Sequence, residues 1–356
     1  MNRIASIIEQ FEDEFLSTYS GKVLPSQLKA LHALKQCRSD TSPLFKLSCS
    51  DCDEYQFIPH SCGHRSCPHC QHHESQQWIE QQLQKHVPAN YFMITFTLPK
   101  ELRSLAWQHQ KAMYQLLFQC AWDTLSTFSA NDKKLSGTPG VVAVLHTHSR
   151  QLNFHPHIHA VMPAAVMDKK HKLWRKKDDK YLFNHKALAK VFRAKILAGL
   201  THLELEKPKH YPEKWVVDVQ SVGAGDKALI YLGQYLYRGV IQEKDILSVK
   251  NGKVTYRYLE SKTKQYKTIT LSGIQFLWRV LQHVLPKGFR RARHYGFLHP
   301  NSKQLVQLIQ LILKVNPIKW LPKKKTRASI KCRCCGGLMH IVRTRIKRSS
   351  IHLAPT

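Results

Sequence analysis

Residues 141–162 read VVAVLHTHSRQLNFHPHIHAVM, and this stretch sets both the expected fold and the expected chemistry. Two apolar runs flank the polar turn SRQLN, which predicts two strands joined as a hairpin. Side chains on a strand alternate between its faces, so His157 and His159 point to one side and Ile158 to the other. Two imidazoles about 7 Å apart along a strand can share one divalent ion.

A histidine pair of this kind is more often an ordinary exposed strand face than a metal site, so the interpretation depends on a second segment. The sequence DKALIYLGQYLYRGV predicts a helix over 227–240. Tyr231 and Tyr235 are four residues apart and share one helical face, whereas Tyr237 turns away. On their own these phenols could be core aromatics. Together with the histidine pair they predict a nuclease in which a phenol attacks a phosphate.

The third ligand of such an ion has two candidates. Gln234 lies beside Tyr231 on the predicted helix, and His146 lies on the strand that precedes the turn. The sequence does not decide between these two residues.

The cysteines predict zinc. Six of the ten lie within residues 37–75, a segment with little apolar pattern that cannot build its own core. Four of them form two knuckles, Cys49-x2-Cys52 and Cys67-x2-Cys70. This spacing is typical of a tetrahedral zinc site, and four sulfur ligands leave no open position for chemistry. We therefore expect one structural Zn²⁺ on the four knuckle cysteines.

Other cysteines offer further metal sites. Cys62, with a nearby histidine (His60, His64 or His69), is a candidate for a second or substitute site. Another knuckle, Cys332-x2-Cys335, lies in the C-terminal region and predicts a possible second zinc, with His340 and His352 as candidate partners.

The charge of the chain predicts a nucleic-acid partner. The 55 Lys and Arg outnumber the 24 Asp and Glu, giving a formal net charge of +31. Most soluble proteins stay nearer neutrality, so this excess favours a polyanion, of which nucleic acid is the commonest. The last 56 residues hold thirteen Lys and Arg and no Asp or Glu, which predicts a sequence-independent grip on DNA.

The composition also limits the setting. No stretch approaches the ~20 apolar residues of a membrane span, and the N-terminus MNRIASIIEQFEDEF has acidic residues where a signal peptide is apolar. We expect a cytoplasmic protein with no membrane partner, in which cysteines serve as metal ligands rather than as disulfides. The oligomeric state is not predicted.

The periodicity predicts four regions. Residues 1–88 combine helices with the zinc-binding segment, and residues 89–245 form an α+β domain. Residues 246–300 are an extension with a hairpin (254–259 and 267–271) and a helix (272–285), and 301–356 are the basic C-terminal region. Within the α+β domain we expect strands at 91–98, 141–148, 154–162 and 215–222, and helices at 100–129, 186–200 and 227–240.

At this point the chain resembles a known family, the two-tyrosine rolling-circle insertion-sequence transposases of bacteria, with an N-terminal zinc-binding domain, within the HUH endonuclease superfamily. The matching segments run in the family's order over about residues 45–300. They are CSDCDEYQFIPHSCGHRSCPHC, FMITFTLP, VLHTHSRQLNFHPHIHAVMP, IYLGQYLYRGVI and FLWRVLQHVLPKGFRRARHYGFL.

The resemblance implies a ferredoxin-like nuclease core, a central antiparallel sheet with helices and the histidines on a central strand. It implies that His157 and His159 bind Mg²⁺ or Mn²⁺ and that Tyr231 and Tyr235 are the nucleophiles. The implied substrate is DNA, chiefly single-stranded element ends and target, cut to a 5′-phosphotyrosine and a free 3′-OH at the bacterial nucleoid. His148 departs from the pattern, because an aromatic residue is expected there.

Three alternatives remain. A plasmid replication initiator or relaxase of the same superfamily shares the chemistry, but the zinc knuckles and the segment VLPKGFRRARHYG favour the transposase. A non-catalytic zinc-finger DNA-binding protein would make the histidines and tyrosines structural. The glycine-rich run 223–228 fits a dinucleotide-binding turn, but the preceding WVVDVQSV alternates polar and apolar residues, unlike a buried parallel strand. We interpret those glycines as a tight turn that starts the tyrosine helix.

Overall fold

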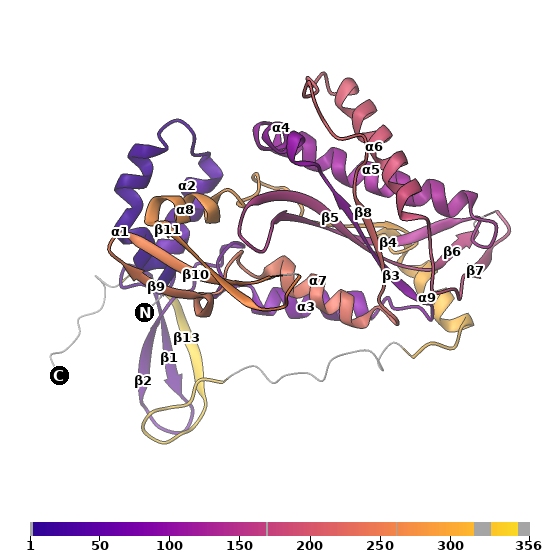
Figure 1. The fold of residues 1–356 in the computed structure, drawn as a ribbon. Coiled ribbons are helices and arrows are strands. Elements are labelled where there is room, and N and C mark those ends of the chain that lie inside the picture. The colour runs from indigo at the N-terminus through magenta and orange to yellow at the C-terminus, as the bar shows by residue number, and fades with distance from the viewer. Residues whose placement is uncertain (1–2, 169, 261, 317–328, 348–356) are drawn as a thin grey trace. The chain divides into compact units, whose positions relative to one another are not determined.

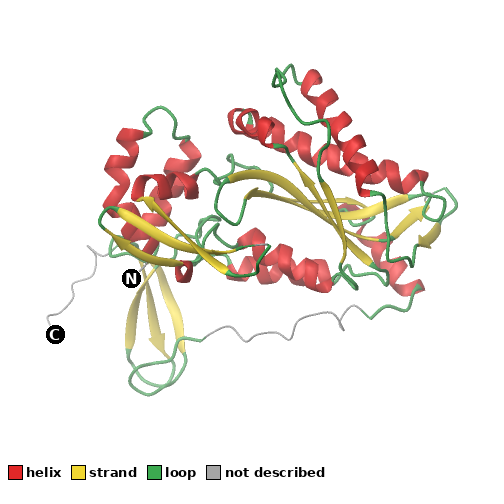
Figure 2. Ribbon diagram, in the orientation of Figure 1, coloured by secondary structure: helices red, strands yellow, loops and turns green. Residues whose placement is uncertain are grey.

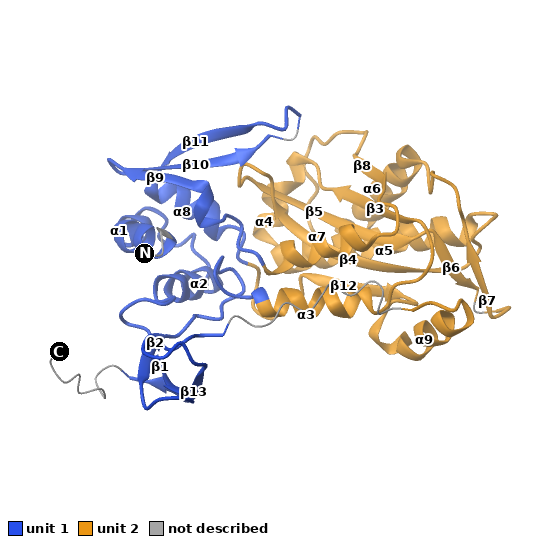
Figure 3. Ribbon diagram, turned by 90° about the horizontal axis from the view of Figure 1, so that it is seen from below, with its two compact units in different colours: residues 1–72, 238–284, 322–356 blue, residues 73–237, 285–321 orange. Residues whose placement is uncertain are grey.

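The computed structural model describes residues 3–168, 170–260, 262–316 and 329–347. Its helices and strands form two compact units, each discontinuous in sequence (Figure 2 and Figure 3). Unit 1 comprises residues 1–72, 238–284 and 322–356, and unit 2 comprises residues 73–237 and 285–321. The linear boundaries predicted after residues 88, 245 and 300 do not coincide with these units, because segments far apart in the chain pack together.

Unit 2 is built around an antiparallel sheet with the order β8-β3-β5-β4 at its centre. These strands are β3 (Tyr91–Thr97), β4 (Thr138–His148), β5 (Phe154–Pro163) and β8 (Val217–Ser221). Helix α5 (Gln110–Asn131) connects β3 to β4, and α6 (His185–His202) connects β5 to β8. Both helices lie on the same side of the sheet (Figure 1). This β-α-β-β-α-β arrangement is ferredoxin-like, which confirms the predicted fold class.

The sheet is extended by strands that the periodicity did not predict. A hairpin of β6 (Ala165–Asp168) and β7 (Leu173–Lys176) continues from the start of β4. Beside β6, β12 (Ala292–Gly296) pairs with β4 over residues 140–144. The predicted helix 100–129 is also interrupted. It consists of η1 (Lys100–Leu102), α4 (Arg103–Gln108) and α5, with the break at His109.

The two faces of the central sheet bury different cores. Inward-pointing residues of one face, including Ile94, Leu145 and Ile158, pack against α5 and α6. Val144 and Val161 on the other face pack with α3 (His72–Leu83), α7 (Asp226–Tyr237) and α9 (Lys303–Ile312). The alternation predicted for residues 141–162 is therefore confirmed, since Ile158 is fully buried on the face opposite to the histidines.

A tight turn places α7 at the end of β8. Gly223 and Gly225 adopt φ angles of +59° and +84°, and a Cβ on Gly225 would lie 2.3 Å from the Tyr91 ring. The close approach to Tyr91 therefore requires glycine at position 225, and the positive φ favours it at position 223. Because β8 is an antiparallel edge strand and not a central parallel one, the dinucleotide alternative is excluded by the topology.

Unit 1 contains two small sheets and a helical cluster. The helices are α1 (Arg3–Thr18), α2 (Pro25–Lys35) and α8 (Gly273–Leu281), as the helical spacing predicted. The predicted hairpin is β10 (Lys253–Leu259) with β11 (Tyr266–Ser272), joined by β9 (Ile246–Lys250). The second sheet has the order β13-β1-β2. Its strands are β1 (Leu44–Cys49), β2 (Tyr55–Pro59) and β13 (Met339–Ile346). A short 3-10 turn, η2 (Glu243–Asp245), also belongs to unit 1, whereas η3 (Pro300–Ser302) belongs to unit 2.

The predicted basic C-terminal region is divided between the two units. Its first part forms α9, whose Val306 and Ile309 are buried in unit 2, while residues 339–346 form strand β13 of unit 1. Residues 317–328 and 348–356, including His352, lie outside the described residues. No helix in the described ranges is long and apolar enough to cross a membrane.

Candidate functional site

Three histidines converge on one face of the central sheet in unit 2. His146 on β4 lies directly opposite His157 on β5, and His159 follows two residues later on the same face. One ring nitrogen from each of the three lies within 4.8 Å of the others. The register of the hairpin thus brings His146, one of the two predicted third ligands, to the predicted pair.

The hydrogen bonds of these imidazoles suit a metal site. Nδ1 of His157 donates to the carbonyl of His155 at 2.6 Å, and Nδ1 of His159 lies 3.4 Å from Oγ1 of Thr95. Such second partners fix the ring orientation and leave Nε2 for an ion. Nε2 of His146 is buried with no hydrogen-bond partner among the described residues, which is an expensive state for a polar atom unless a ligand satisfies it.

Burial also keeps the three imidazoles neutral. It lowers the pKa of His157, with help from His159, to about 3, and lowers the pKa of His159 to about 4. Burial and the neighbouring histidines hold the pKa of His146 well below its usual range. Neutral imidazole is the form that binds a metal ion. The donor set therefore fits a divalent cation.

Helix α7 places both predicted nucleophiles beside this cluster. The Tyr235 ring stacks on His146 with centroids 3.3 Å apart, and the Tyr231 ring is 6.5 Å from His159 and 6.4 Å from Tyr235. Tyr237 packs against the core on another side of the helix. Gln234 is exposed on α7 and remains a prediction as a ligand.

The two tyrosines have different surroundings. Tyr231 is 47% exposed, whereas Tyr235 is partly buried and its hydroxyl lies 2.8 Å from Nδ1 of His148. Burial raises the pKa of Tyr235, and the charge of Arg291 opposes that rise. The guanidinium of Arg291 lies 5.0 Å from the centroid of the Tyr235 ring. The hydroxyl of Tyr235 is thus held in a fixed polar environment, while the Tyr231 side chain is the more exposed of the two.

Arg291 joins the strand to the helix at this point. Its Nε donates to the carbonyl of Leu145 at 3.2 Å and its Nη1 to the carbonyl of Leu236 at 3.3 Å. Nη2 is buried without a hydrogen-bond partner among the described residues. One guanidinium therefore fixes the end of α7 against β4 and keeps a positive charge beside Tyr235.

The cysteines of unit 1 form two four-sulfur clusters, and this corrects the predicted ligand set. Cys67 and Cys70 do not meet Cys49 and Cys52. They lie instead with Cys62 and with Cys37, which follows α2. The sulfur pairs in this first cluster are 3.6–3.8 Å apart. A tetrahedron with Zn–S of ~2.3 Å has edges of about 3.8 Å, so the spacing fits one zinc.

The second cluster joins the two predicted knuckles from opposite ends of the sequence. Cys49, the last residue of β1, and Cys52, in the turn that follows it, meet Cys332 and Cys335, which precede β13. The sulfur distances are 3.4–3.7 Å. The pairing of β13 with β1 brings these turns together. The prediction of a single zinc on the four N-terminal knuckle cysteines is therefore wrong in its grouping, because local spacing does not reveal a partner 280 residues away in the chain.

Backbone hydrogen bonds support both clusters as metal sites. The N–H groups of Asp51, His64 and Gly337 each lie 3.4 Å from the sulfur of the cysteine two residues earlier. Such bonds stabilise thiolate, the form that binds metal. The bond from Asp51 is the first cause of the pKa of Cys49 falling to about 7.

The histidines proposed as additional zinc ligands have other partners. His60 stacks on Phe45 and its Nε2 accepts from the N–H of Arg345. His69 lies 2.9 Å from a carboxylate oxygen of Glu243, and Nδ1 of His64 accepts from the N–H of Ser66. His340 stands on β13 opposite Ser48, outside the cluster.

Sequence reasoning missed two residues of these sites, Cys37 and Arg291, and the contact of His148 with Tyr235. His148 was visible as a departure from the family pattern, and Arg291 lies in the matching segment FRRARHYGFL. Cys37 had no motif spacing that could identify it, because its place in the cluster depends on how α2 packs.

Comparison with known proteins gives a consistent result. Residues 140–305 match a family model described as "Putative transposase", and residues 7–98 match one described as "Transposase zinc-binding domain". The "Putative transposase y4qJ" of Sinorhizobium fredii is 28% identical over 318 residues, which cover 83% of this chain and 80% of the relative. The "Transposase for insertion sequence element IS801" of Pseudomonas savastanoi pv. phaseolicola is 28% identical over 269 residues, 69% of this chain and 63% of the relative.

Among solved structures, the conjugative relaxase TrwC in complex with oriT DNA matches 63% of this chain and 72% of its own in the metal-free form. The metal-bound form matches 64% and 73%. The identities are 14% and 15%, with TM-scores of 0.28 and 0.29, and no conclusion rests on a likeness of that size.

The two family models together span the zinc-binding segment, both histidine-bearing strands, the tyrosine helix and the segment that carries Arg291. The chain belongs to the rolling-circle insertion-sequence transposases with an N-terminal zinc-binding domain.

Proposed function

We propose that this transposase cuts and rejoins single-stranded DNA through a covalent phosphotyrosine, with Tyr231 and Tyr235 as nucleophiles. A divalent ion, Mg²⁺ or Mn²⁺, would be held by His146, His157 and His159. One observation carries the proposal: the two phenols share the face of α7 that meets three neutral imidazoles. Three ligands leave coordination positions open, as catalytic metal sites do.

The chemistry follows from a phosphodiester placed between the tyrosines and the histidines. A phenol oxygen attacks the phosphorus and forms a new P–O bond, while the bond from phosphorus to the 3′ oxygen breaks. The phenol loses its proton and the 3′ oxygen gains one, so the products are a 5′-phosphotyrosine and a free 3′-OH. The ion supplies Lewis-acid stabilisation of the non-bridging phosphate oxygens. Attack by a 3′-OH on the phosphotyrosine reverses the step and rejoins a strand.

The residues around Tyr235 would prepare it for this reaction. A phenol ionises near pH ~10 and is a weak nucleophile at neutral pH. His148 and Arg291 fix the position of the Tyr235 oxygen and place a positive charge nearby. A fixed, charged environment lowers the barrier by positioning and by stabilising the charge that develops. Tyr231, with its greater exposure, would receive the second strand end.

The cysteine clusters would each hold one structural Zn²⁺. Four sulfurs per ion leave no open coordination position, so these ions would stabilise unit 1 and take no part in cleavage. The partner would be DNA, and we place the activity at the nucleoid in the bacterial cytoplasm.

An assay for covalent adducts tests the proposal. Purified protein is incubated with labelled single-stranded DNA and Mn²⁺, denatured, and analysed on a gel. The wild type should form an adduct. The double variant Tyr231→Phe with Tyr235→Phe should form none, because it lacks both attacking phenol oxygens. The rings remain, so the fold should be unchanged. Each single variant should still cut once but fail in complete transposition in cells. Adducts persisting in the double variant would assign the chemistry to another residue.

The same assay separates the alternatives. A non-catalytic zinc-finger protein would form no adduct under any metal condition. A replication initiator or relaxase would form adducts but would not mobilise an insertion sequence, and no observation favours that assignment over the transposase.

A further inference from the structure

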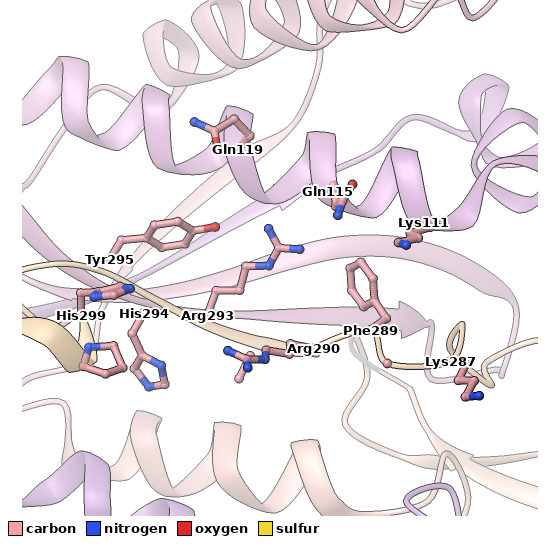
Figure 4. Close-up of a pocket in the computed structure, with 13 residues that line it drawn as sticks. Lys111, Gln115, Gln119, Lys287, Phe289, Arg290, Arg293, His294, Tyr295 and His299 are labelled. Atoms are coloured by element: carbon pink, nitrogen blue, oxygen red, sulfur yellow. The ribbon is translucent and has the colours of Figure 1, made fainter.

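A groove of about 660 Å³ follows the edge of the unit 2 sheet, on the side of β12. Helix α5 lines one wall with Lys111 and Gln115, and the segment before β12 lines the other with Lys287 and Arg290. Figure 4 shows Lys111 and Gln115 on one side of the groove and Lys287 and Arg290 on the other. We call this surface the β12 groove.

The β12 groove is strongly positive. Its lining includes two lysines, two arginines and two histidines, and contains no aspartate or glutamate. Lys111, Lys287 and Arg290 are exposed, and none of them forms a salt bridge within the described residues. Three unneutralised cations that line one groove repel each other, so a bound anion would reduce this electrostatic repulsion.

The floor of the groove is preformed. The Arg293 guanidinium lies 4.4 Å from the centroid of the Phe118 ring. Tyr295 stacks on Trp122 at a centroid distance of 5.0 Å. Because these side chains are packed against α5, a ligand would not have to order them, which favours binding. A basic groove with aromatic rings in its floor is the arrangement by which proteins hold single-stranded nucleic acid.

The groove and the candidate active site are joined through consecutive residues. Arg290 lines the groove, and Arg291, the next residue, lies over the Tyr235 ring. The side chains of β12 also reach both faces of the sheet. Arg293 and Tyr295 face α5, whereas His294 contacts Gln82 of α3 on the other face. The groove is therefore lined by the residue next to the one whose guanidinium lies over the Tyr235 ring.

We propose that the β12 groove binds the phosphate backbone of the single-stranded DNA next to the cleaved phosphodiester and guides it to Tyr235. This inference rests on the proposed cleavage of single-stranded DNA. Lys111, Lys287 and Arg290 grip phosphates without reading bases, so the groove contributes affinity and direction but no sequence preference.

Salt-dependent binding tests the groove without requiring cleavage. The triple variant Lys111→Ala, Lys287→Ala, Arg290→Ala is compared with wild type by fluorescence anisotropy on a labelled single-stranded oligonucleotide, in EDTA. Each phosphate contact on a single strand contributes ~0.7 to the slope of log K against log salt. The slope should therefore fall by about 2 in the triple variant, and the charge-preserving variant Lys111→Arg, Lys287→Arg, Arg290→Lys should restore it.

A matched control removes three other exposed lysines of unit 2, Lys186, Lys190 and Lys207. Its slope should remain within about 0.5 of the wild type, since solvated charges away from the path release no counterions. An equal fall in the control and groove variants would overturn the proposal, as would no fall in either. A fall seen only with duplex DNA or only with RNA would overturn the assignment of the occupant.

The outcome for the groove is separate from the outcome for the reaction. The slope comparison is made in EDTA and does not depend on cleavage, and adduct formation with Mn²⁺ is measured separately on the wild type. Failure of the wild type to form an adduct would refute the proposed function, while the slope comparison in EDTA would still decide whether the groove binds the strand.

Discussion

The cysteine clusters of unit 1 and the histidine cluster of unit 2 are both small sets of metal-ligating side chains, yet they are built differently. Each cysteine cluster closes on itself with four sulfurs. The histidine cluster has three members, and two tyrosines lie beside it. The cysteines come from turns in segments with little core of their own, whereas the histidines stand on buried strands of a large sheet.

This difference predicts that the cysteine clusters contribute to folding and that the histidine cluster contributes to the reaction. A closed site stabilises the folded state most when it links chain segments that cannot otherwise pack together, because its metal then contributes to the free energy of folding. An open site on a rigid sheet does not need its ion in order to fold, because apolar packing already fixes the ligands. Loss of the histidine ion should therefore cost activity and not stability, and loss of a cysteine ion should do the opposite.

The largest expected effect tests the open site. The variant His157→Ala with His159→Ala should lower adduct formation at least ~1,000-fold, since loss of several kcal/mol of phosphate stabilisation costs tenfold for each ~1.4 kcal/mol. Binding of single-stranded DNA in EDTA should stay within threefold of the wild type. Gel quantification of adducts and anisotropy measure the two quantities.

His155→Ala is the matched control, because His155 lies on the same strand but outside the histidine cluster. Its carbonyl still accepts the bond from His157 after the substitution. Adduct formation within tenfold of the wild type is expected. If the His157→Ala, His159→Ala double variant cleaved DNA as well as the wild type, the histidine cluster would not be the site of the catalytic ion.

The closed sites predict an effect on stability. Purified protein should contain two zinc ions per chain, and Cys67→Ser should lose one of them. Because structural zinc contributes ~10 kcal/mol or more to folding in small domains, unit 1 of this variant should unfold at a clearly lower denaturant concentration. Elemental analysis and circular dichroism in a denaturant series measure this.

Two neighbouring cysteines test the assignment of the second cluster. Cys335→Ser should lose the second zinc, whereas Cys334→Ser should keep both, because only Cys335 belongs to a cluster. Both residues are exposed, so their burial does not differ. Equal zinc content in these two variants would contradict the assignment of the second cluster.

The sequence predicted the histidine site better than the cysteine sites, for a physical reason. Alternation along a strand fixes which face each residue occupies, so Ile158 and its flanking histidines could be placed from the sequence alone. Helical spacing did the same for Tyr231 and Tyr235. A cysteine cluster has no such periodicity. The partners of Cys49 depend on the pairing of β13 with β1, which arises from tertiary packing across most of the chain.

Strands at the margins escaped prediction for a related reason. β12 is only five residues long, and β13 carries two arginines and a histidine among its eight residues. Their identity as strands therefore depends on the neighbour each one pairs with. The same limit hid Arg291, whose importance is evident only when the register of β12 places it beside Tyr235.

A smaller effect is expected at Arg291. Arg291→Lys keeps the positive charge but cannot donate to the carbonyls of both Leu145 and Leu236. The Tyr235 environment should loosen, and adduct formation in a Tyr231→Phe background should fall about 10- to 100-fold, the usual cost of misplacing a reacting group. In a Tyr235→Phe background the same substitution should change adduct formation by less than threefold. Equal losses in both backgrounds would mean that Arg291 supports the whole site and not Tyr235.

The smallest effect is expected at Tyr237, which lies outside the histidine site. Tyr237 lies on the same helix as the two proposed nucleophiles, but it packs against the core around α3 and α7, and burial raises its pKa. Tyr237→Phe removes only the hydroxyl, so adduct formation should remain within twofold of the wild type and the free energy of unfolding within about 1 kcal/mol. The measurement is the adduct assay alongside a denaturant series on the same preparation. If this substitution lowered adduct formation as much as Tyr235→Phe, the reactive face of α7 would have to be redrawn around Tyr237, and the contrast between an open histidine site and its packed surroundings would no longer hold.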